Sequence, residues 1–311
     1  MLVLVAPGQG AQKPGFLNPW LDLPGVADRL REWSDAIDLD LVHYGTEAGA
    51  EEIRDTAVAQ PLLVASALVS AGALLDGLEP GRVLGATAGH SVGELAAAAT
   101  AGVFPAGTAM SLVRTRGRAM AEAAAVAETG MSAVLGGEPE AVTAHLKGLG
   151  LTPANINGGG QIVAAGTAEQ LAALAADRPE GARVIPLKVA GAFHTEHMAP
   201  AVTTLEAAVR DVAAEDPAIR YVSNKDGQVV ASGDEVVQRL VGQVANPVRW
   251  DLCMETFQEL GATALIEVCP GGTLTGLAKR GLPGVQTLAL KSPDDLDAAR
   301  ALVTEHAATA E

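Results

Sequence analysis

A five-residue turn constrains the fold of this chain more than any other segment. Gly89-His90-Ser91-Val92-Gly93 lies between the apolar run 82–86 and the alanine-rich run 94–99. The first run predicts a buried strand and the second predicts a helix. A Gly-x-Ser-x-Gly turn between a strand and a helix is typical of a nucleophile elbow, in which helix N–H groups stand behind an exposed serine. The segment therefore predicts an α/β chain with a nucleophilic serine. A glycine-rich turn without chemistry is the alternative.

Composition bounds the size of the fold and the kind of partner. Of the 311 residues, 49% are hydrophobic but only 3% are aromatic, so a large core must be built from Ala, Val and Leu. This length fits one large domain, or a large domain that carries a smaller one. The formal charge of −16 argues against nucleic acid or an anionic membrane surface as the main partner. An acidic partner would need a local basic patch.

The cysteines and the apolar segments predict a cytoplasmic location. Cys253 and Cys269 form neither a disulfide framework nor a metal-ligand spacing, and they favour buried thiols in a reducing compartment. Residues 1–5 lack the basic flank and long apolar segment of a signal peptide and predict a first buried strand. The apolar stretch 62–75 is too short to span a bilayer. We expect a cytoplasmic chain without a metal site or a membrane partner.

Helices and strands alternate along most of the chain, which predicts a mostly parallel sheet. One helix is expected to start at Pro61, because proline suits the first turn of a helix. Another helix, over 105–125, carries Arg114, Arg116 and Arg118.

The segment between residues 128 and 190 has a different pattern. Strands are expected at 131–135, 154–156, 161–165 and 182–187, and helices at 138–149 and 167–176. Their order, β-α-β-β-α-β, is ferredoxin-like. We therefore expect a large α/β domain formed by residues 1–127 and 191–311, with a ferredoxin-like subdomain inserted at 128–190.

A serine nucleophile needs a base, because its hydroxyl is barely acidic at neutral pH. Three of the six histidines lie in an early loop, in the inserted segment and in the tail: His43, His145 and His306. His90 is adjacent to Ser91, and the chain geometry points its side chain elsewhere. His194 and His197 remain, and His197 begins the next expected helix, where a capping or solvated residue is favoured.

Several further segments occur in a fixed order along nearly the whole chain. They are PGQGAQ at 7–12, QP at 60–61, GHSVGE at 89–94, RTRGRAM at 114–120, AFH at 192–194, SN at 223–224 and NPVRW at 246–250. In this order and spacing they resemble the malonyl-CoA:acyl carrier protein transacylases, the free-standing acyltransferases of bacterial fatty acid and polyketide synthesis. The resemblance implies an α/β-hydrolase-like large domain with a parallel sheet and a ferredoxin-like insertion.

The resemblance also implies a ping-pong reaction. Ser91 would be the nucleophile and His194 its base, and the serine would carry the malonyl group between two thiols. The oxyanion hole would be formed by the backbone N–H groups of Gln9 and Val92. A backbone carbonyl at Gln243, in place of an acidic residue, would orient the histidine.

Substrate selection follows from the same resemblance. Arg116 would hold the malonyl carboxylate in a two-pronged ion pair, whereas Arg114 and Arg118 are expected to be solvated surface charges. Phe193 would fill the space that a methyl branch on the substrate needs, and His90 would lie beside the acyl pocket or pack as a structural residue. Two side chains are expected to support the site from behind: Gln60 and Asn224.

No permanently bound cofactor is implied. The substrates would be malonyl-CoA and the phosphopantetheine thiol of an acidic acyl carrier protein, of fatty acid or of polyketide synthesis, and the chain is expected to be a monomer. Candidate basic residues for carrier docking are Arg183, Lys188, Lys279 and Arg280. The alternatives are a thioesterase or esterase on the same scaffold, or a carrier-binding module that has lost catalysis.

Overall fold

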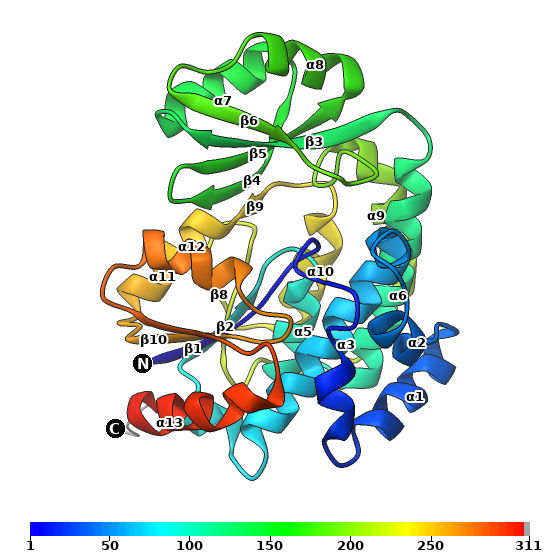
Figure 1. Ribbon diagram of the computed structural model, residues 1–311, viewed down its shortest axis with the longest axis vertical. Coiled ribbons are helices and arrows are strands. Elements are labelled where there is room, and N and C mark those ends of the chain that lie inside the picture. The colour runs from blue at the N-terminus through cyan, green and yellow to red at the C-terminus, as the bar shows by residue number, and fades with distance from the viewer. Residues whose placement is uncertain (308–311) are drawn as a thin grey trace.

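Two β-sheets, one above the other in Figure 1, organise the chain. The computed structural model describes residues 1–307. The larger sheet has six strands in the order β11-β10-β1-β2-β7-β8, all parallel except the β7–β8 pair. Its strands are β1 (Leu2–Ala6), β2 (Ala86–Gly89), β7 (Arg220–Val222), β8 (Val229–Val230), β10 (Ala264–Glu267) and β11 (Gln286–Ala289). The predicted α/β class and the mostly parallel sheet are confirmed.

Helices cover both faces of this sheet. They are α1 (Val26–Ile37), α2 (Leu41–Thr46), α3 (Thr56–Leu75), α4 (Pro80–Val83), α5 (Gly93–Thr100), α6 (Ala106–Ala124), α9 (Ala199–Ala208), α10 (Gly233–Gln243), α11 (Trp250–Glu259), α12 (Thr273–Gly281) and α13 (Leu296–His306). Alternate side chains of β1 enter different cores, as a strand buried on both faces requires. Leu2 and Leu4 join the core with α3 and α5, whereas Val3 and Val5 pack with α11 and α12.

Helix α3 begins at Thr56, not at Pro61 as expected. The Asp55 carboxylate caps the helix by accepting a hydrogen bond from Ala57 N at 2.8 Å. Pro61 therefore lies inside the helix, where it has no N–H to donate to the Ala57 carbonyl. That carbonyl instead accepts a hydrogen bond from Nη1 of Arg114 at 3.0 Å.

Arg114 is consequently not the solvated surface charge that was expected. Its Nε also donates to Ile37 O at 3.1 Å, and its Nη2 donates to Asp38 O at 3.0 Å, so one guanidinium joins α6 to the end of α1 and to α3. Arg118, on the same helix, is exposed as predicted.

The apolar segment around residues 62–75 is also longer than expected. Helix α3 has 20 residues and a mean hydropathy of 1.9, which by length and composition alone suffices to cross a bilayer. In the fold, 83% of its apolar window is buried, so the helix forms part of the core.

The smaller sheet has the order β6-β3-β5-β4-β9. Its strands are β3 (Thr129–Gly136), β4 (Thr152–Gly158), β5 (Gln161–Thr167), β6 (Ala182–Pro186) and β9 (Val248–Arg249), and its helices are α7 (Pro139–Gly148) and α8 (Ala168–Ala176). The first four strands are antiparallel and have the ferredoxin-like order. Strand β9 comes from the C-terminal part of the chain and pairs in parallel with β4. The larger body thus joins the small sheet through a strand as well as through its connections.

The expected strand at 82–86 is wrong. Pro80 starts the short helix α4, which ends at Val83, and the strand begins only at Ala86. The observed strand ends at Gly89, so the turn that follows it is placed as the sequence predicted.

Candidate active site

The turn between β2 and α5 holds Ser91 in a strained backbone conformation. Ser91 has φ of +53°, in the left-handed region that non-glycine residues rarely adopt. A Cβ at Gly89 would lie 1.9 Å from the carbonyl carbon of Gly93, and a Cβ at Gly93 would lie 2.3 Å from Ala6 O. Both positions therefore require glycine, and the turn is as tight as a nucleophile elbow demands.

His194 meets the serine from the other side of the turn. Its Nε2 lies 2.8 Å from Ser91 Oγ, and its Nδ1 lies 2.9 Å from the carbonyl oxygen of Gln243. Gln243 is the last residue of α10, so this carbonyl is one that the helix leaves without an internal partner. Because a carbonyl can only accept, Nδ1 carries the proton and Nε2 is free to accept the serine proton.

Burial keeps this imidazole neutral. His194 is 3% exposed, and burial together with the nearby charge of Arg116 lowers its pKa to about 3. The lone pair on Nε2 is therefore available at neutral pH.

Arg116 lies beside the same hydroxyl. Its side chain is 3% exposed; Nη1 donates to Gln60 Oε1 at 2.6 Å, and Nη2 donates to Gln243 Oε1 at 2.8 Å and to Ser91 Oγ at 3.3 Å. Burial lowers the pKa of Arg116 to about 10, and the carboxylate of Glu94 opposes this shift. The guanidinium is therefore a buried cation next to the nucleophile.

Two backbone N–H groups near Ser91 have no protein acceptor. Within residues 1–307, the N–H groups of Gln9 and Val92 form no backbone or side-chain hydrogen bond, although both residues line the pocket at Ser91. The N–H of Ser91 itself is engaged, because it donates to Asn224 Oδ1 at 2.8 Å. Val92 precedes the first residue of α5, so its N–H also belongs to the positive end of that helix.

A cavity of about 240 Å³ opens onto these groups and is lined by both layers of the molecule. From the large body come Gln60, His90, Ser91 and Phe193, among others, and from the small sheet come Asn155, Asn157, Gln161 and Val163. A ligand on Ser91 would therefore be enclosed between the elbow and the face of the small sheet.

His90 links the two layers at this cavity. Its Nε2 lies 2.8 Å from Asn157 Oδ1 on β4, and its ring packs 5.7 Å from that of Trp250. Burial lowers the pKa of His90, and the hydrogen bond to Asn157 opposes this shift. Ser91 Oγ is thus hydrogen-bonded to His194, whereas the His90 ring is bonded to Asn157.

Sequence reasoning missed some residues of this site. Asn157 was not singled out, although it contacts His90, and Glu94 was quoted only as the last letter of a motif. Glu94 is 1% exposed and contacts both Asn224 and Gln243. A glutamate in the first turn of a helix has an ordinary explanation in the helix dipole, so its sequence position carried no further signal.

A strained serine, a neutral histidine and two free backbone N–H donors, one of them at a helix start, form an acyl-transfer site. The acyl transferase domain family matches residues 3–298, and the chain belongs to this family. It is 52% identical to the malonyl CoA-acyl carrier protein transacylase of Mycobacterium tuberculosis, over 96% of this chain and 98% of that protein. It is 33% identical to the protein of that name from Bacillus subtilis, over 96% of each chain.

Solved structures agree with this assignment. The crystal structure of MCAT from Mycobacterium tuberculosis superposes with a TM-score of 0.92 and 51% identity, over 96% of this chain and 99% of the other. A type II PKS acyl-carrier protein in complex with its malonyl-transacylase gives a TM-score of 0.88 at 30% identity, over 97% and 99% of the two chains.

Proposed function

We propose that this chain transfers a malonyl group from malonyl-CoA to the phosphopantetheine thiol of an acyl carrier protein. The observation that carries the proposal is the buried guanidinium of Arg116, 3.3 Å from Ser91 Oγ. Gln60 and Gln243 each accept one N–H, and Ser91 Oγ accepts the second N–H of Nη2. The second N–H of Nη1 is left for a carboxylate, and the N–H directed at Oγ can turn to the same carboxylate once Oγ carries the acyl group. The names of the relatives, and the carrier protein bound to one of them, support both substrates.

In the first half of the reaction, Ser91 becomes acylated. As Oγ attacks the thioester carbonyl carbon, its proton passes to Nε2 of His194. The N–H groups of Gln9 and Val92 donate to the oxyanion, a type of contact worth roughly 3–4 kcal/mol per donor. The carbon–sulfur bond then breaks, and coenzyme A leaves with the proton from His194.

In the second half, the phosphopantetheine thiol enters the same cavity. Its proton passes to Nε2 of His194, its sulfur attacks the ester carbonyl, and the Ser91–acyl bond breaks with return of the proton to Oγ. The Gln243 carbonyl keeps the histidine in one orientation and tautomer throughout. The chain therefore acts through a Ser91–His194 dyad whose histidine is held by the backbone carbonyl at the end of α10.

Arg116 supplies the preference for malonyl over acetyl groups. A malonyl ester places its free carboxylate at the guanidinium, where two charge-assisted hydrogen bonds form. An acetyl ester has no group to pair with this buried cation, and desolvation of an unpaired charge is costly.

Radiolabelled malonyl-CoA tests the proposal. The labelled enzyme is isolated and then incubated with phosphopantetheinylated carrier protein. Transfer of the label to the carrier thiol is expected, and Ser91→Ala should remain unlabelled. Release of free malonate before the carrier is added would indicate a thioesterase or esterase. Absence of label on the wild-type chain would indicate a binding module without catalysis.

Carrier docking is proposed at the mouth of the cavity. The basic side chains at 183, 188, 279 and 280 are all exposed, on an otherwise acidic molecule. Lys188 lies between Leu187 and Val189, which both line the cavity, and helix α12 lines it before reaching Lys279 and Arg280. Residues 128–190, which we propose as the inserted subdomain, would then contribute one side of the docking surface.

A further inference from the structure

Glu94 is a buried carboxylate that the transfer reaction does not use. It is 1% exposed and lies in the first turn of α5. Its Oε1 accepts a hydrogen bond from the backbone N–H of Asn224 at 2.7 Å, and its Oε2 accepts one from Nε2 of Gln243. Burying a carboxylate costs several kcal/mol even when it is hydrogen-bonded. An exposed carboxylate could interact with the helix N-terminus equally well, so the helix start alone does not explain the burial of Glu94.

Gln243 connects this carboxylate to the substrate cation. Its Nε2 donates to Glu94 and to Ser91 O, the latter at 3.0 Å, while its Oε1 accepts from Nη2 of Arg116 at 2.8 Å. A side-chain amide can be turned over, which exchanges its donor and acceptor. An ionised carboxylate only accepts, so Glu94 fixes the amide with its oxygen toward Arg116.

We infer that Glu94 is a positioning residue that orients the Gln243 amide and thereby holds Arg116 at the place of the malonyl carboxylate. The inference rests on the proposed malonyl transfer, because it deepens the specificity of that same site.

A second contact of Glu94 reaches the nucleophile turn. The Asn224 backbone that it binds carries a side chain whose Oδ1 accepts from Ser91 N and whose Nδ2 donates to Gly89 O, both at 2.8 Å. One carboxylate is thus joined through Gln243 to Arg116, and through Asn224 to the elbow.

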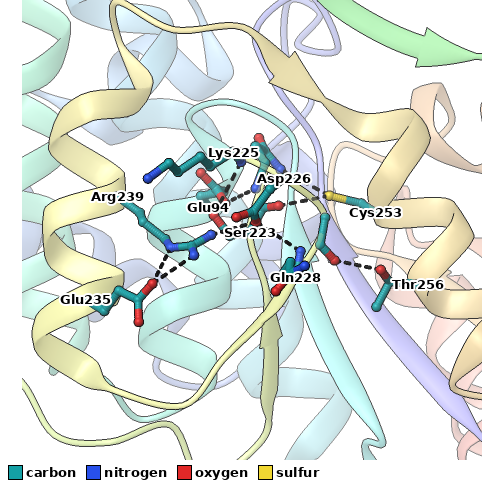
Figure 2. A network of polar contacts seen from close by, with 11 residues as sticks. Glu94, Ser223, Lys225, Asp226, Gln228, Glu235, Arg239, Cys253 and Thr256 are labelled. Atoms are coloured by element: carbon teal, nitrogen blue, oxygen red, sulfur yellow. Dashed lines mark hydrogen bonds and ion pairs between the residues drawn. The ribbon is translucent and has the colours of Figure 1, made fainter.

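The loop that presents Asn224 is also held from outside, as Figure 2 shows. Arg239 forms ion pairs with Asp226 at 2.6 Å and with Glu235 at 2.7 Å, and the Thr256 hydroxyl donates to Gly227 O at 2.6 Å. Glu235 is half-exposed, and its carboxylate pairs with Arg239 rather than with Gln243, so it offers a matched control for a carboxylate-to-amide change in the same network.

The titratable groups that face Glu94 come from three elements. They are Arg116 on α6, Tyr221 on β7 and Cys253 on α11. Burial raises the pKa of Glu94 to about 7, and the hydrogen bonds that it accepts and the Arg116 charge oppose this shift. Burial, and then the Glu94 charge, raises the pKa of Tyr221 and of Cys253 well above their usual ranges. Glu94 is therefore the group of this cluster that titrates near neutral pH.

Glu94→Gln separates the positioning role from mere packing. The new amide can accept only through its oxygen, and the Asn224 backbone N–H cannot be turned over. The NH2 of the introduced glutamine therefore faces Gln243, whose amide must reverse to accept from it. This reversal directs Nε2 of Gln243 at the guanidinium of Arg116, where two donors oppose each other.

The measured quantity is the ratio of kcat/KM for Ser91 acylation by malonyl-CoA to that by acetyl-CoA. We expect Glu94→Gln to lower this ratio by about 10- to 100-fold, the size of a lost hydrogen bond to a charged group. Acylation by acetyl-CoA and labelling of Ser91 by a fluorophosphonate should fall much less than acylation by malonyl-CoA. Glu235→Gln should keep the wild-type ratio, and Glu94→Asp, which keeps the charge, should lie closer to wild type than Glu94→Gln.

An unchanged ratio in Glu94→Gln overturns the inference. So does an equal loss of malonyl transfer, acetyl transfer and fluorophosphonate labelling, because that pattern indicates general damage. If the wild-type chain does not transfer malonyl at all, the proposed function fails instead. If Glu94→Gln does not fold, the same ratio is measured on the wild-type chain at pH values from 5.5 to 8.5. It should fall as the pH drops through about 7, and a flat ratio rejects the positioning role.

Discussion

Nη2 of Arg116, on helix α6, lies 3.3 Å from Oγ of Ser91, in the turn before α5, although the two residues are 25 positions apart in the chain. Gln60 and Gln243 hold the guanidinium on either side, so it cannot swing into solvent. A cation fixed this close to a nucleophile repels a positively charged acyl group, and a neutral acyl group leaves the cation without a partner. It favours an acyl group that carries its own negative charge.

Arg116→Ala should therefore change which substrate is used. We expect kcat/KM for malonyl-CoA to fall roughly 100- to 1,000-fold, the equivalent of losing two charge-assisted hydrogen bonds. Acetyl-CoA acylation should stay unchanged or rise, because the unpaired cation is gone. Stopped-flow release of coenzyme A from each substrate measures both. Arg118→Ala, at an exposed position on the same helix, is the control. An equal fall for both substrates would falsify the assigned role.

Sequence reasoning captured the order of elements better than their limits. The small sheet was predictable because its strands and helices follow one another as short, separate segments, and because Thr167 caps α8 with a capping box. Strand β2 was misplaced because three of the four residues in Ala86–Gly89 are alanine or glycine, which have weak strand propensity. Its parallel neighbours β1 and β7 select the strand conformation there. That is a tertiary effect, which local pattern does not show.

The site residues also fall into those that local sequence indicates and those that only the fold brings together. Ser91 and His194 stood out because their residue types and flanking turns indicate nucleophilic chemistry. Glu94 did not, because its partners Asn224 and Gln243 lie 130 and 149 positions away along the chain. A carboxylate near a helix start has a local explanation, and only the folded arrangement gives it a second one.

His194 should make folding sensitive to acid. Its pKa falls from about 6.5 in the unfolded chain to about 3 in the fold. Below pH 6.5 the unfolded chain therefore binds a proton that the native state refuses. The stability from this group is fully present above pH 6.5 and is lost as the pH falls toward about 3, by about 4–5 kcal/mol in total.

Urea unfolding of wild type and His194→Asn from pH 7 to 4 tests this expectation. The difference in unfolding free energy between the two should shrink as the pH falls. His43→Asn, at a side chain that is 46% exposed, gives the baseline. A constant difference across this range would rule out the buried neutral imidazole.

Arg114 and Pro61 form an unusual pair whose energetic coupling can be measured. The guanidinium supplies the hydrogen bond that Pro61 cannot give to Ala57 O. Arg114→Lys should lower the unfolding free energy by about 1–3 kcal/mol, since a partly buried carbonyl loses its donor. In a Pro61→Ala background the restored N–H reaches Ala57 O, so the same substitution should cost less.

Thermal and urea unfolding of the four chains complete this double-mutant cycle. Arg118→Lys, on the exposed side of α6, should stay within about 0.5 kcal/mol of wild type. Additive effects of Arg114→Lys and Pro61→Ala would mean that the guanidinium does not compensate for the proline.

Phe193 should set the tolerance for branched acyl groups. It is 6% exposed, lines the cavity and precedes His194. Phe193→Ala should raise kcat/KM for methylmalonyl-CoA relative to malonyl-CoA by roughly 5- to 100-fold, because one methyl group is worth about 1–3 kcal/mol in such a pocket. Competition between the two substrates measures the ratio. The ratio for Phe193→Leu should lie between those of the wild type and Phe193→Ala. An unchanged ratio in Phe193→Ala, with malonyl transfer intact, counts against the assignment.

Lys188 offers the sharpest test of the carrier surface. It is exposed between Leu187 and Val189, which line the cavity, so a carrier that delivers its thiol must pass close to it. Lys188→Glu should raise the half-saturating concentration of an acidic carrier by about 2- to 10-fold, an effect that fades as salt is added. Acylation by malonyl-CoA alone should not change. Lys147→Glu, on α7 at the far side of the small sheet, is the matched control (Figure 1). If Lys188→Glu slows acylation as much as carrier transfer, the lysine acts at the acyl site and the docking surface lies elsewhere.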